Sequence, residues 1–165
     1  MTSSERLLRT AYYAVISLPI AFAPSAVRAR NTRRVLRTPF DLNAPGPLRT
    51  VAHSLLSGAV GLLTWFAMFL ACVGAVRGAL YPLIAGNDLE HSWGGPGLAG
   101  AWAVHAALGI GLLPLWLLLT AAFGMIQLRL ARRLLGRTGH WWPVPLALAL
   151  ILGGAAFFTA WWHQA

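Results

Sequence analysis

One connecting segment of this chain gathers side chains suited to ligand recognition. The candidates for ligand or partner binding are Tyr81, Asp88, Glu90, His91, Trp93, Trp102 and His105. Carboxylates and imidazoles offer charge and hydrogen bonds, whereas aromatic rings offer flat apolar surfaces. The set therefore suits a polar ligand or an external loop of a partner protein. The alternative is a loop that only covers the end of a helix bundle, with Trp93 and Trp102 as anchors at the membrane interface.

Sequence motifs of enzymes are absent or lack their context. The string Gly95–Gly100 satisfies G-x-G-x-x-G, but a dinucleotide site needs a preceding strand and an acidic residue about 20 positions later. No acidic residue follows Glu90. These glycines predict a tight loop that leads into a helix. The sequence contains no HExxH, GxSxG or Walker motif, so we expect no catalytic residues and no enzyme.

Five histidines raise the question of haem. His53 with His140, and His105 with His163, would lie at two levels of a membrane, as axial ligands do in a dihaem membrane cytochrome. His140 and His163 lie outside pairs of tryptophans, which places them in the wet interface. Cys72 is the only cysteine and excludes a site built from several thiolates. We therefore expect interfacial histidines, with no metal and no cofactor.

Four apolar stretches determine the fold class. They comprise residues 11–27, 51–76, 101–123 and 144–162. A span of about 20 apolar residues matches a hydrocarbon core of roughly 30 Å. The composition agrees, with 58% hydrophobic residues and a mean hydropathy of +0.64. We expect one all-α integral membrane helix bundle over residues 1–165, with three firm transmembrane helices and a shorter, proline-broken N-terminal one.

The charges indicate orientation. All 13 basic residues are arginine, and they concentrate in residues 28–50 and 124–140. Positive loops remain in the cytoplasm, so the chain is expected to be a multi-pass protein of the cell (plasma) membrane with residues 77–100 outside. Arginines at this surface suit anionic lipid headgroups of the bilayer. This distribution argues against nucleic acid as a partner.

Small residues and prolines add detail to the predicted helices. Ser57 with Gly61, and further alanines and glycines four apart in each of the three later stretches, predict close helix packing into a bundle, and they allow a homo-oligomer. These small residues are Ala67, Ala71, Ala75, Ala103, Ala107, Gly111, Ala149 and Gly153. Pro114 predicts a kink. Residues 11–27, interrupted by Pro19 and Pro24, either span, re-enter or lie in the interface, and a short basic helix is expected near residues 28–37.

The external segment also resembles a known family. The residues are Tyr81-Pro82-Leu83, Ser92-Trp93-Gly94-Gly95-Pro96, Leu98–Trp102 and His105, and Arg129–Gly136 adds a cytoplasmic arginine-leucine stretch. They resemble the actinobacterial sensor domain, a membrane domain found alone or N-terminal to histidine kinases. The resemblance covers roughly residues 5–137 and implies signal perception. Two departures are the fourth apolar stretch, 144–162, and a compressed N-terminal region with one proline-broken segment where the family is expected to have a hairpin. This sequence also contains no kinase domain.

Together these features favour a non-enzymatic membrane sensor or regulatory protein. Residues 77–105 are expected to perceive an external cue and to signal through a protein partner, namely a kinase, a regulator or a larger membrane subunit. The alternative is a small accessory or assembly subunit of a membrane transporter or respiratory complex.

Overall fold

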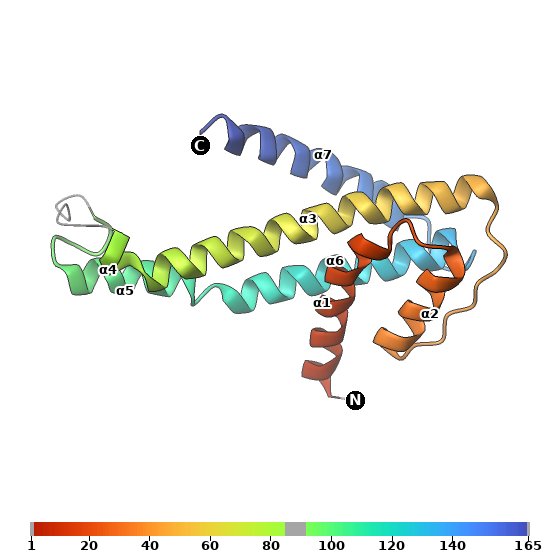
Figure 1. Ribbon diagram of the computed structural model, residues 1–165, viewed down its shortest axis with the longest axis horizontal. Helices are drawn as coiled ribbons and strands as arrows, with labels where there is room; N and C mark the ends of the chain where they lie inside the picture. Colours follow the sequence, from red (N-terminus) through yellow and green to blue (C-terminus); the bar gives the residue numbers. More distant parts are fainter. Residues whose placement is uncertain (1, 85–91, 165) are drawn as a thin grey trace. The chain divides into compact units, whose positions relative to one another are not determined.

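The computed structural model describes residues 2–84 and 92–164, and every regular element in these ranges is an α-helix. The elements are α1 (Ser3–Ile20), α2 (Ser25–Leu36), α3 (Pro47–Ala79), α4 (Tyr81–Ile84), α5 (Leu98–Gly109), α6 (Leu113–Leu134) and α7 (Pro143–Trp162) (Figure 1). The predicted all-α fold class is confirmed.

Within the described residues, three segments are long and apolar enough to cross a membrane: Pro47–Ala79, Leu98–Leu134 and Pro143–Trp162. They coincide with the three firm spans expected from hydropathy. The second segment is interrupted between α5 and α6, directly before Pro114, where a kink is predicted. Pro114 is the second residue of α6, a position where a missing N–H removes no helical hydrogen bond.

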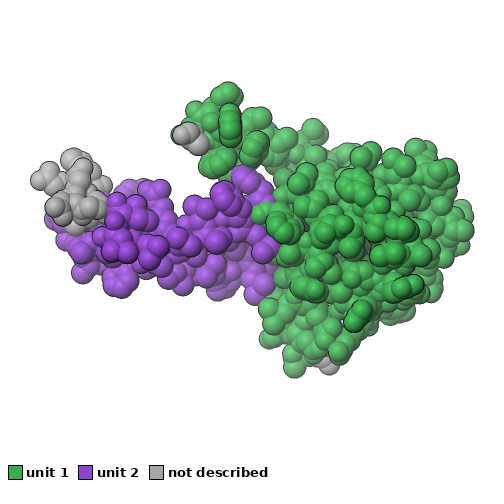
Figure 2. Space-filling model, in the orientation of Figure 1, with its two compact units in different colours: residues 1–65, 119–165 green, residues 66–118 purple. Residues whose placement is uncertain are grey.

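The chain forms two compact units (Figure 2). Unit 1 comprises residues 1–65 and 119–165, and unit 2 comprises residues 66–118. Unit 1 holds α1, α2, α7, the first half of α3 and most of α6. Unit 2 holds the second half of α3, α4, α5 and the start of α6.

The N-terminal region of unit 1 is a helical hairpin. The Tyr13 hydroxyl lies 2.9 Å from the Thr32 hydroxyl, and Arg9 donates to the Val35 carbonyl over 3.2 Å. Residue numbers thus fall along α2 as they rise along α1, so the two helices are antiparallel. The proline-broken segment expected at 11–27 is a helix, a turn and the start of a second helix. α2 is the basic helix expected near residues 28–37. α1 is not among the segments apolar enough to span.

A side chain from α3 allows α1 to continue through a proline. Pro19 has no N–H, so the Val15 carbonyl four residues earlier loses its helical donor. The indole N–H of Trp65 donates to that carbonyl over 2.9 Å. α1 therefore reaches Ile20 although Pro19 lies inside it.

Glycines bring the helices of unit 1 into contact. A Cβ added to Gly61 of α3 would lie 2.9 Å from the Leu18 Cβ, and one added to Gly124 of α6 would overlap the Thr10 carbonyl. Both partners belong to α1. Because a side chain would fill these spaces, Gly61 and Gly124 allow α1 to pack closely on α3 and α6.

The packing face of α7 differs from the predicted one. Ala149 is exposed and a Cβ on Gly153 would meet nothing within 4 Å. Ala147 is fully buried instead, and Gly154 packs against Leu63 of α3. Positions 147 and 154 lie seven residues apart, two turns along one side of the helix. The prediction chose the wrong side because small residues occupy several sides of α7.

Two polar side chains join α3 to α6. The Ser57 hydroxyl donates to Gln127 Oε1 over 2.6 Å, and Gln127 Nε2 donates to the Ser57 carbonyl over 3.1 Å. Both side chains are buried. Paired hydrogen bonds of this kind stabilise contacts between apolar helices.

The bond from Trp65 to Val15 gives a test by double substitution. Trp65→Phe should lower the free energy of unfolding by about 1–2 kcal/mol, because the Val15 carbonyl loses its donor. In a Pro19→Ala background the restored helical N–H takes that place, so the cost of Trp65→Phe should fall to about 0.5 kcal/mol or less. Reversible unfolding of all four proteins in mixed detergent micelles measures both costs. Equal costs in the two backgrounds would contradict this account.

Candidate functional site

Unit 2 brings Tyr81 and His105 together. Tyr81 begins α4 and His105 lies in α5, and their rings stack with centroids 3.7 Å apart and planes inclined by 15°. The Tyr81 hydroxyl is 2.5 Å from the Ser92 hydroxyl. Tyr81 is buried and His105 is half-buried. The result is a flat aromatic pair with polar groups at its edges.

The hydrogen bond of His105 defines its tautomer. Nδ1 lies 2.8 Å from the Ala101 carbonyl oxygen. A carbonyl only accepts, so Nδ1 carries the proton and Nε2 carries the lone pair of the neutral ring. The site can therefore accept a hydrogen bond from a ligand at Nε2 and offer an aromatic surface beside it.

Close contact between the α3 and α5 backbones positions His105. A Cβ added to Gly78 would lie 2.5 Å from the His105 carbonyl oxygen and 3.1 Å from the Gly109 Cα. A Cβ added to Gly109 would overlap the Gly74 carbonyl. Gly74 and Gly78 form a G-x-x-x-G pair, the spacing that lets apolar helices approach closely. Ser92 and these glycines were not among the predicted site residues, although the G-x-x-x-G spacing was visible in the sequence.

The predicted small-residue face of α5 is on the wrong side. Ala103 and Ala107 are exposed, whereas Ala101 is fully buried and Gly109 contacts α3. Residues 105 and 109 thus contact α3, and the buried Ala101 lies four residues before His105 on the same side of α5. The alanines at 103 and 107 share the same spacing, so spacing alone does not identify the packed side.

The other predicted site residues lie apart from the stack or beyond the described ranges. Trp93 is 75% exposed and Trp102 is 46% exposed, so both rings lie at the surface. Asp88, Glu90 and His91 lie outside the described residues. The loop predicted from the glycines is present, since Gly94 and Gly95 have φ values of 106° and 93° that favour glycine.

A buried arginine connects the hairpin of unit 1 to α3. Nη1 of Arg28 lies 2.9 Å from His53 Nδ1, 2.9 Å from the Ser54 hydroxyl and 3.1 Å from the Ala21 carbonyl. Arginine only donates, so His53 accepts at Nδ1 and holds its proton on Nε2. Burial lowers the pKa of the Arg28 guanidinium because it penalises the charged form. His53 is therefore a buried hydrogen-bonding residue.

Sequence reasoning treated Arg28 as one of several equivalent arginines. A usable signal was its spacing from Thr32 and Leu36, which places all three on one side of a helix. These three side chains are buried in α2. Arg30, Arg33 and Arg34 make the segment polar overall, so its composition does not reveal which side is buried.

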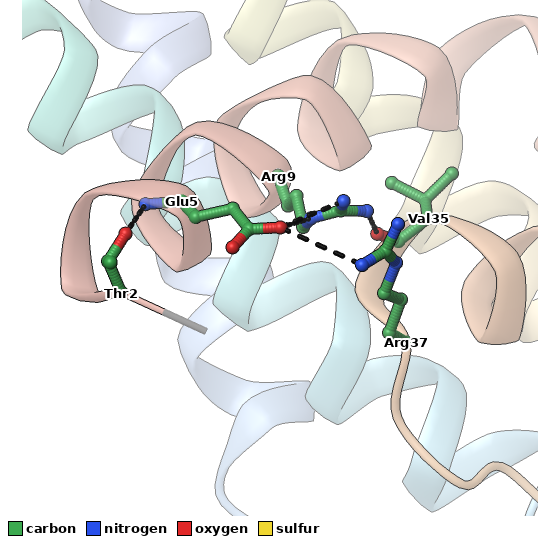
Figure 3. Close-up of polar contacts among 5 residues, drawn as sticks. All are labelled: Thr2, Glu5, Arg9, Val35 and Arg37. Atoms are coloured by element: carbon green, nitrogen blue, oxygen red, sulfur yellow. Dashed lines mark hydrogen bonds and ion pairs between the residues drawn. The ribbon is translucent and has the colours of Figure 1, made fainter.

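A second polar cluster lies at the open end of the hairpin (Figure 3). Oε1 of Glu5 is 3.0 Å from both Nε and Nη2 of Arg9 and 3.8 Å from Nη1 of Arg37. The Thr2 hydroxyl accepts from the Glu5 N–H at 3.2 Å and caps α1. One carboxylate oxygen thus faces two guanidinium groups.

The end of α6 carries a third basic feature. The guanidinium of Arg129 lies 4.6 Å from the ring centre of Trp142, a cation–π contact. A cavity of about 350 Å³ beside it is also lined by Arg132 and His140. Trp142, predicted as a membrane anchor, therefore also contacts a cation.

Within residues 2–84 and 92–164, no group of three or more His, Cys, Asp or Glu side chains is placed to hold a metal ion. No protein-family model, curated protein or solved structure matches the chain.

Two glycine substitutions test the α3–α5 contact. Gly109→Ala should cost about 1–3 kcal/mol of unfolding free energy, because the new methyl group overlaps the Gly74 carbonyl. Gly153→Ala is the matched control, since its Cβ meets open space and alanine gains up to about 1 kcal/mol in a helix. Unfolding in mixed micelles measures both. Similar behaviour of the two variants would exclude a close contact at Gly109.

Proposed function

We propose that this chain is a non-enzymatic sensor or regulator of the cell membrane that perceives an external cue through unit 2. The observation that supports it best is the Tyr81–His105 stack beside the α3–α5 contact. A ligand that bonds to His105 Nε2, or competes with Ser92 for the Tyr81 hydroxyl, changes the position of the rings. Since the His105 backbone touches Gly78, such a change also acts on how α3 packs against α5.

The arginines support the orientation in this proposal. Residues 28–50 and 124–140 face the cytoplasm, and residues 77–100 face outward. α3 and α6 each contribute to both units, so a change in unit 2 has a covalent route to the basic segments of unit 1. A kinase or another regulator contacts those basic segments.

One feature favours the alternative, an accessory subunit of a larger membrane complex. Little of α7 is buried, and Leu148, Leu152 and Trp162 are largely exposed. A helix with so much apolar surface suits lipid, and it suits a second membrane protein equally well.

Replacement of the chromosomal gene tests the proposal. Tyr81→Ala combined with His105→Ala should reproduce at least half of the transcript changes caused by deleting the gene, because the ligand-binding pair is lost. Membrane-fraction immunoblots must show wild-type amounts of the variant. Leu83→Ala is the matched control, because Leu83 is 81% exposed in the same short helix as Tyr81.

The outcome separates the two functions. Wild-type transcript levels in the double variant, together with clear changes in the deletion strain, would reject sensing through this pair. If a stoichiometric membrane complex disappears from native gels in the deletion strain but remains in the double variant, the result would support the accessory subunit.

A further inference from the structure

A cavity of about 400 Å³ lies in unit 1 where α1, α2 and α6 meet. Its walls include the two arginines of the cluster around Glu5, a third arginine, two threonines and two leucines. The residues that matter are Arg6, Arg9, Arg37, Thr38, Leu36 and Leu128. The cavity therefore combines cationic, hydroxyl and apolar groups.

The cavity has an excess of positive charge. Three guanidinium groups line it, and Glu5 is the one carboxylate that the described residues place in an ion pair with them. The formal excess is two positive charges. Both ion pairs use the same oxygen of Glu5, and Arg37 is the more distant partner at 3.8 Å. Arg9 and Arg37 thus face the same oxygen, and like charges placed in this way repel one another unless further negative charge joins them.

Two further details point to a ligand. Arg37 has φ 50° and ψ 37°, a left-handed conformation at the end of α2 where glycine is usual. The chain thus keeps a cationic side chain at a position whose backbone favours glycine. The Thr38 hydroxyl oxygen is buried and has no hydrogen-bond partner within the structure. Thr38 itself lines the cavity, so a rotation of its side chain turns this hydroxyl toward an acceptor oxygen of a ligand.

We propose that this cavity binds a phosphate group. Its oxygens accept from the guanidinium groups of Arg6 and Arg37 in the planar, paired geometry that arginine favours, and from the Thr38 hydroxyl. Arg9 remains with Glu5. Leu36 and Leu128 add an apolar wall that suits the acyl chains of a phospholipid. The phosphate comes from an anionic lipid headgroup or from free phosphate. The proposal concerns unit 1 and is independent of sensing through unit 2.

Binding to the full-length protein in non-ionic detergent tests the proposal. One arm titrates phosphatidylglycerol against phosphatidylcholine in mixed micelles, and the other titrates inorganic phosphate against chloride at equal ionic strength. Arg37→Gly and Arg6→Gln should each weaken binding about five- to tenfold, because each removes a charged donor. Glycine suits the backbone at position 37, so Arg37→Gly should unfold at the wild-type temperature when phosphate is absent.

Arg30→Gln is the matched control. Arg30 is exposed on α2 and does not line the cavity, so this variant loses the same charge and should change affinity less than about twofold. Tight binding of phosphatidylglycerol that Arg37→Gly weakens supports a lipid source. Binding of inorganic phosphate alone, weakened in the same way, supports a soluble source. Equal losses in Arg30→Gln and Arg37→Gly, or no loss in Arg37→Gly, would overturn the proposal.

Discussion

The structure depends on one constraint: a polar group in an apolar helix must find its hydrogen-bond partner inside the protein. Trp65 meets this need for the Val15 carbonyl, and Ser57 and Gln127 meet it for each other. The Thr64 hydroxyl donates to the Val60 carbonyl of its own helix. The Trp65 bond lies beside the point where Leu18 of α1 packs against Gly61 of α3.

Backbone contact at glycine is the second organising feature, and it recurs in both units. In unit 1 it places α1 on α3 and α6, and in unit 2 it places α5 on α3. The Tyr81–His105 stack follows from the contact in unit 2, because His105 is part of the touching backbone. The candidate site is thus built on a helix contact and does not depend on the exposed tryptophans.

Hydropathy predicted the apolar spans, since length and composition suffice for them. Hydropathy did not predict the structure of residues 11–36. Their hydrophobicity is moderate, and a helical hairpin gives the same hydropathy pattern as one helix broken by prolines. Small residues are so common in α5 and α7 that their spacing is compatible with several packing faces. In the structure the packed faces are those of Gly109 and Gly154. Tyr81 and His105 could be chosen as candidate site residues from their side-chain types. Their stacking could not, because it depends on how α4 and α5 fold back on each other. The burial of Arg28 was not predicted, because the composition of an arginine-rich segment does not show which one of its arginines is buried.

Residues 19 and 65 constrain the order in which this sequence can change. Once Pro19 is replaced, the Val15 carbonyl regains a donor and position 65 is free to vary. If Trp65 is replaced first, the Val15 carbonyl is left without a donor, and we expect this intermediate to be less stable. Related chains are therefore expected to keep both residues, to lose the proline alone or to lose both, and a lineage with the proline but no donor at position 65 should be rare.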